Sequence, residues 1–141
     1  MFKKTLLSLV VCAGIVSSVS AQEELRADMG KMAADLSSVQ IGFFTNNKKD
    51  TLAALMDLKG IVYKTIGDKK TITKLLPEEV RYKSSIAINS AELINRYIDE
   101  IEDILKDKNM RMINRQMRSQ KAFLEIEKQC FRCHNLVRDW E

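Results

Sequence analysis

Hydrophobic residues recur along this chain with the three- and four-residue steps of an α-helix. In the first segment after residue 21 the steps alternate between four and three, which places the apolar side chains on one helix face. These positions are Leu25, Met29, Met32, Leu36, Val39 and Phe43. Three later segments repeat the rhythm, and connecting stretches at residues 45–50, 68–76 and 106–109 separate the four. The pattern predicts an all-α protein, an up-down-up-down antiparallel four-helix bundle.

Glycine, proline and acidic residues indicate where the predicted helices begin and end. Gly67 is placed to end the second helix, and residues 68–76 are expected to form a short connection. Pro77 suits the first turn of the third helix, where its missing N–H would have no partner anyway, and Glu78 follows near the positive end of the helix dipole. The fourth helix is expected to run from about residue 110 to residue 139.

The first 21 residues are expected to be a signal peptide. Lys3 and Lys4 precede a short apolar stretch, and the small residues that end at Ala21 are typical of a cleavage site. Cleavage there would remove Cys12 and leave one domain, residues 22–141. We expect this domain to be exported to the periplasm and to contain no membrane span.

The charge and composition exclude several classes of function. The whole chain has a formal net charge of +4, and loss of Lys3 and Lys4 would reduce it to +2. The sequence contains no basic stripe with interleaved aromatic residues, so nucleic-acid binding is not expected. It also contains no recognisable acid–base pair or nucleophile constellation, so we do not expect an enzyme.

One motif carries most of the chemical information. In "EKQCFRCHNLVR", Cys130 and Cys133 are separated by two residues and His134 follows directly. Cys-x-x-Cys-His is the attachment motif of c-type haem, in which each thiol forms a thioether with one vinyl group and the histidine binds the iron. At ~100° per residue, the three side chains fall within an arc of about 100° on one helix. They can therefore serve one bound group.

Other uses of these residues are less well matched. A structural zinc site wants four nitrogen or sulfur ligands, whereas residues 22–141 offer two cysteines and one histidine. A thioredoxin-like dithiol would lie near a βαβ pattern, and this chain has none. A haem-free helical metal-binding protein remains the alternative from another class.

A predicted four-helix bundle with this motif near the end of its last helix resembles the cytochrome c-prime family, the class II c-type cytochromes. The similarity in residues is concentrated in "CFRCHNLVR". Arg138 matches a basic position of the family motif, whereas Val137 departs from an aromatic one. The resemblance implies one covalent haem c with His134 as the proximal iron ligand. It also implies haem-edge or propionate contacts for Arg26 and Arg138, and a homodimer formed through the first two helices.

The second iron ligand decides which function the resemblance implies. His134 is the only histidine, which excludes a second one. Met29 lies about five residues after the start of the first predicted helix, and His134 about five residues before the end of the antiparallel fourth, so both sit ~8 Å from the same end. Met29 also matches the ligand position in the low-spin branch of the family. A Met/His iron would carry electrons between redox partner proteins.

Two alternatives to Met29 remain open. Met32 lies one turn deeper along the same helix face. An alignment on Arg26 instead places Gly30 at the distal position, which would leave that side of the iron open. A five-coordinate iron of this kind would bind nitric oxide or carbon monoxide, and the protein would then bind gas.

Overall fold

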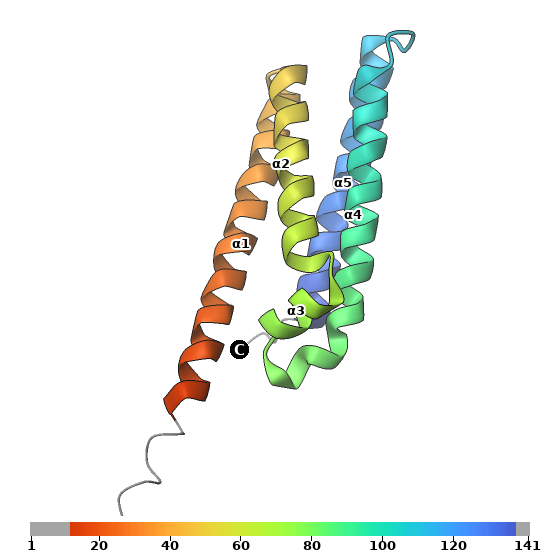
Figure 1. Cartoon of the computed structure of the whole chain (residues 1–141). Helices are drawn as coiled ribbons and strands as arrows, with labels where there is room; N and C mark the ends of the chain where they lie inside the picture. The colour runs from red at the N-terminus through yellow and green to blue at the C-terminus, as the bar shows by residue number, and fades with distance from the viewer. Residues whose placement is uncertain (1–11, 138–141) are drawn as a thin grey trace, which may run out of the picture.

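The predicted all-α class is confirmed. A computed structural model describes the backbone of residues 12–137 and the side chains of residues 21–137. This part of the chain forms no strand. It forms five α-helices and one 3-10 helix, namely α1 (Cys12–Phe44), α2 (Lys48–Ile66), α3 (Lys69–Leu75), η1 (Glu78–Lys83), α4 (Ser84–Lys106) and α5 (Met112–Val137) (Figure 1).

The long helices pack in two pairs. α1 packs against α2, α4 packs against α5, and contacts between α2 and α4 join the two pairs. The short α3 contacts α1, α2 and α4, and lies with η1 at one end of the molecule (Figure 1). The core includes aliphatic side chains from α2, α4 and α5 that are almost completely buried, among them Leu55, Leu58, Ile98, Ile101 and Ile126. Each such side chain stabilises the fold by roughly 1.5–3 kcal/mol.

The expected short connection at residues 68–76 is wrong, because it contains the helix α3. Asp68 caps this helix: its carboxylate accepts hydrogen bonds from the backbone N–H of Thr71 at 2.8 Å and from the Thr71 hydroxyl at 3.0 Å. Ile72 and Leu75, three residues apart, are both buried. A good N-cap and two core contacts are enough to stabilise two helical turns inside a longer fold.

The predicted start of the third long helix is also wrong. Pro77 precedes the 3-10 helix η1, and α4 begins only at Ser84. Val80 is buried, and its N–H donates to the Pro77 carbonyl at 3.1 Å, while Arg81 Nε donates to the Leu76 carbonyl at 3.3 Å. These contacts hold the segment after Pro77 in tighter 3-10 turns before the regular helix begins.

The remaining boundaries follow the sequence more closely. Gly67 ends α2, where its N–H donates to the Tyr63 carbonyl at 3.2 Å, and a Cβ at this position would lie only 2.6 Å from that oxygen. The predicted last helix corresponds to α5, although residues 138 and 139 lie outside the described part. The predicted cleavage point after Ala21 falls within α1, and residues 1–11 lie outside the described part. None of the described helices combines the length and the hydropathy needed to cross a membrane.

Candidate functional site

α5 turns both cysteines of the motif toward the core. Cys133 is buried within the main hydrophobic cluster, and Cys130 is half-buried and packs against that cluster. Phe123 and Ile126 lie on the same buried face, and Val137 is half-buried against it, as the helical spacing predicts. The two thiols therefore project from one side of α5 into apolar surroundings.

The surroundings keep both thiols protonated. Cys130 and Cys133 are free cysteines and do not form a disulfide. Burial, with smaller contributions from Cys133 and Glu127, raises the pKa of the Cys130 thiol to about 11. Burial also raises the pKa of Cys133, and a hydrogen bond with Ser90 on α4 offsets part of this shift. Redox-active dithiols usually have a lowered pKa, so these cysteines do not have the properties of a thioredoxin-like pair.

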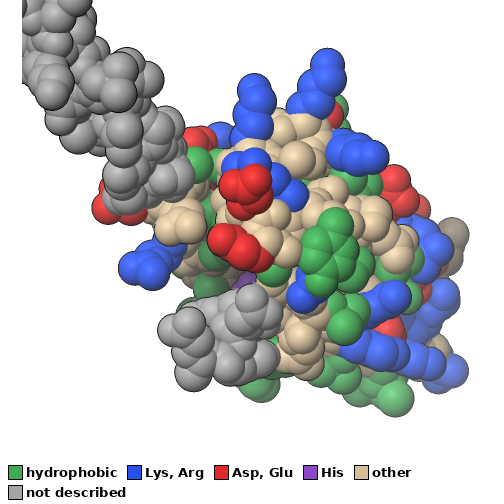
Figure 2. Space-filling view, turned by 90° about the horizontal axis from the view of Figure 1, so that it is seen from below, with side chains coloured by type: hydrophobic (Ala, Val, Ile, Leu, Met, Phe, Trp, Pro, Cys, Tyr) green, Lys and Arg blue, Asp and Glu red, His purple; other side chains and the backbone are tan. Residues whose placement is uncertain are grey.

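His134 follows Cys133 near the end of α5 and is half-buried. One helical turn separates it from Cys130, so its ring lies close to the direction in which the cysteines project. Figure 2 views the molecule from this end, where charged side chains of both signs lie among hydrophobic ones. The α5 end therefore combines two thiols with a neighbouring imidazole that is only partly covered.

The residues of α1 that are predicted to lie near the haem are on two different sides of the helix. Met32 is buried in the core, and Met29 is half-buried and packs against it. Arg26 and Gly30 are exposed, and a Cβ on Gly30 would meet no other atom within 4 Å. Both methionines thus pack in or against the main hydrophobic cluster, which also includes Cys133, whereas Arg26 and Gly30 lie on the exposed side of α1. α1 and α5 themselves make few direct contacts. Arg138 lies outside the described residues.

A buried carboxylate next to Met29 joins α1 to α2. Asp28 is 8% exposed and accepts a hydrogen bond of 2.8 Å from the hydroxyl of Thr65, which is fully buried. Lys64 Nζ lies 3.2 Å from each Asp28 carboxylate oxygen. These contacts fix the position of α1 along α2 beside Met29. Sequence reasoning missed Asp28, because the partners of an isolated acidic residue on another helix cannot be read from helical spacing.

A second polar residue is buried beside the cysteines. Gln129 directly precedes Cys130 and is 6% exposed, and its Oε1 has no hydrogen-bond partner among the described residues. A buried acceptor without a partner is uncommon in folded proteins and needs an explanation. The sequence alone could have pointed to Gln129, because it is a polar residue between Ile126 and Cys133 on an otherwise apolar helix face.

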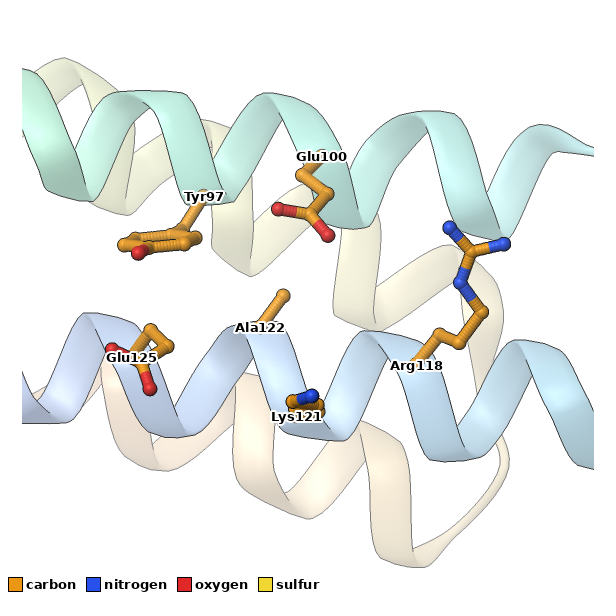
Figure 3. Close-up of a pocket in the computed structure, with 6 residues that line it drawn as sticks. All are labelled: Tyr97, Glu100, Arg118, Lys121, Ala122 and Glu125. Atoms are coloured by element: carbon orange, nitrogen blue, oxygen red, sulfur yellow. The ribbon is translucent and has the colours of Figure 1, made fainter.

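A groove elsewhere on the surface contains none of these residues. It lies between α4 and α5, and Figure 3 shows charged side chains of both signs along it. Its lining consists of Tyr97, Glu100, Arg118, Lys121, Ala122 and Glu125. The groove is therefore separate from the candidate site.

Within residues 21–137, no group of three or more His, Cys, Asp or Glu side chains is arranged to hold a metal ion.

Comparisons of the chain with known protein families, with curated proteins and with solved structures find no match. Function must therefore be inferred from the residues themselves. Those with a defined chemistry are the two buried thiols, the adjacent imidazole and the two methionine thioethers that pack against the same core.

Proposed function

We propose that this protein is a periplasmic monohaem c-type cytochrome that resembles the c-prime family and carries one electron between redox partner proteins. In this proposal the four long helices form the up-down-up-down bundle of that family. The observation that carries the proposal is the pair of free, protonated thiols on the inward face of α5, directly before a half-buried histidine.

The donor set fits a covalently attached haem. Cys130 and Cys133 would hold it through thioether bonds, formed when each S–H adds across one vinyl double bond, with sulfur on one carbon and hydrogen on the other. His134 would bind the iron through the unprotonated nitrogen of its neutral ring. When bound, the haem iron accepts and releases one electron. The apolar residues around the cysteines would exclude water from one side of the group and so influence its reduction potential.

Met29 is the proposed second iron ligand. Its side chain packs against the core that also receives Cys130 and Cys133, whereas Gly30 is exposed. This difference supports the alignment that places Met29, and not Gly30, at the distal position. Met32 is more deeply buried in the same core and is the second choice. Contacts of Arg26 and Arg138 with the haem propionates stay predictions, as does a homodimer.

The first test is covalent haem attachment. The full chain is produced in cells that carry a c-type maturation system and is examined for haem after denaturing electrophoresis. We expect a haem-stained band for the wild type and no such band for the double variant Cys130→Ser/Cys133→Ser. A wild-type band without haem would overturn the proposal and favour a haem-free helical protein.

The second test concerns the iron ligands. We expect low-spin optical spectra for the wild type and a high-spin spectrum for Met29→Ala, because loss of the thioether leaves one coordination position open. Met56→Ala, at an exposed position on α2, is the matched control and should stay low-spin. A high-spin wild type that binds nitric oxide or carbon monoxide would replace the electron carrier by the gas-binding alternative.

A further inference from the structure

α5 carries an apolar stripe on the side that faces away from the core. The stripe consists of Ile113, Met117, Leu124 and Phe131, which are between 57% and 68% exposed. Their spacing of four, seven and seven residues aligns them within about 40° around the helix and over ~27 Å along it. The buried residues of α5, such as Ile126 and Cys133, lie on the opposite side. None of the helices in the described part of the chain covers this stripe.

The same helix carries an excess of positive charge. α5 contains five basic and two acidic residues, a net charge of +3, whereas the whole chain has a net charge of +4. Lys121, Lys128 and Arg132 are exposed and follow one edge of the stripe. Lys128 forms an ion pair of 3.2 Å with Glu125 on the same helix, and this exposed pair is weak in water. The stripe therefore has a basic edge along most of its length.

We propose that the apolar stripe of α5 is the docking surface for an acidic protein partner. The inference rests on the proposed function, in which that partner exchanges an electron with the haem. Apolar side chains repeated at four- and seven-residue steps on an exposed helix face can serve as the anchors through which a helix docks on a partner. A second copy docked through the same stripe would bring +3 against +3, which opposes association. A membrane-surface helix buries a broad apolar face, whereas Gln120 and Glu127 adjoin this narrow stripe.

The stripe reaches the candidate site through Phe131. This residue lies between Cys130 and Cys133 in sequence, and its side chain is on the outer side of the helical turn from which the cysteines point inward. The thickness of one helix, ~10 Å, therefore separates a partner on the stripe from the cysteines. Small interfaces of below about 1,200 Å² are typical of transient electron-transfer complexes, and four apolar side chains with a basic edge suit that size. Opposite charges would also accelerate the encounter.

The test uses a defined acidic probe and the full mature chain. The probe is a fluorescent synthetic helix with leucines at seven-residue intervals and glutamates beside them, and its twin carries lysines in place of the glutamates. Binding is followed by fluorescence anisotropy at low and high salt. We expect the acidic peptide to bind and the basic twin not to bind. Salt should weaken binding by screening the charges.

Variants assign the binding to the stripe. Leu124→Ser/Phe131→Ser and Lys121→Glu/Lys128→Glu should each weaken binding of the acidic peptide by about tenfold or more, and the charge variant should also lose the salt dependence. The matched controls are Ile41→Ser on α1 and Lys48→Glu/Lys49→Glu on α2, which alter exposed residues elsewhere and should leave binding unchanged.

Several outcomes would overturn the docking surface. They are equal binding of both peptides, no binding at low salt, control variants that weaken binding as much as the stripe variants, and a dimer in sedimentation that the stripe variants abolish. Haem staining of the same preparations separates the two proposals. Haem without peptide binding overturns the docking surface alone. Stripe-dependent binding by a wild type that lacks haem overturns the cytochrome and leaves the surface.

Discussion

Two levels of the core, at different heights along the helices, differ in the contacts that stabilise them. At the first level, Phe43 and Phe123 meet edge to face with ring centroids 5.7 Å apart, and Val39 and Ile126 beside them are completely buried. The second level comprises the cysteine motif of α5 and the Met29 region of α1, where Cys130 and Met29 are only half-buried. Polar groups there, including those of Asp28 and Gln129, are buried instead. At the first level the buried hydroxyls of Ser119 and Thr51 donate to backbone carbonyls one turn earlier along the chain. At the second level Asp28 is bonded to another helix, and Gln129 Oε1 has no partner among the described residues.

The largest expected effect is at the first level. Phe123→Ala should lower the free energy of unfolding by about 3–5 kcal/mol, because it removes a buried ring and leaves a cavity beside Phe43. Denaturant unfolding of the haem-free protein measures this. Phe131→Ala removes the same ring from an exposed position on the same helix and should change stability by no more than about 0.5 kcal/mol. Similar losses for both variants would contradict the assigned core.

Helical spacing predicts the first level better than the second. The steps of three and four identified all four long helices and the face that joins Phe123 to Cys133, because burial of one face determines that spacing. They missed α3, because the cap at Asp68 acts locally within a stretch predicted to be a connection. They also missed the late start of α4, because the residues after Pro77, predicted to be its first turn, form tighter 3-10 turns. The Asp28–Thr65 contact was also missed, because it depends on how far one helix is shifted along another.

The second expected effect concerns the cysteine level and pH. In haem-free protein, burial raises the pKa of Cys130 from 9.0 to about 11 in the folded state. Below pH 9 the thiol is protonated in both states and contributes no pH dependence. Between pH 9 and 11 the unfolded chain loses this proton and the folded chain keeps it, so stability should fall by roughly 2–3 kcal/mol as pH rises.

Unfolding curves at several pH values measure this decline. Cys130→Ser has no thiol at this position, so its stability should fall less over the same pH range. Haem attachment converts the thiol to a thioether and should have the same consequence. An equal decline in the serine variant would show that another group titrates there.

The third expected effect tests the polar contact beside Met29. Asp28→Ala leaves the buried Thr65 hydroxyl without its acceptor, which should cost about 1–3 kcal/mol of stability. Asp99→Ala is the matched control, because Asp99 is exposed and pairs with Lys59 at the surface, where ion pairs contribute about 0–1 kcal/mol. In haem-loaded protein, Asp28→Ala should also increase the high-spin fraction if α1 holds Met29 against the iron. Asp28→Asn keeps an acceptor and should restore most of both properties.

The smallest expected effect separates packing from function at the cysteine level itself. Gln129→Leu replaces a buried amide, whose Oε1 has no partner among the described residues, by an apolar side chain of similar size. In haem-free protein the change should be neutral or raise the free energy of unfolding by about 1 kcal/mol, because an uncompensated polar group is removed from the core. Chemical denaturation measures it, with Gln120→Leu on the exposed side of α5 as the matched control.

A loss of more than about 1 kcal/mol would mean that Gln129 already stabilises the haem-free fold. If the variant is as stable as the wild type but its haem-loaded form has a shifted reduction potential, Gln129 influences the haem and does not stabilise the fold.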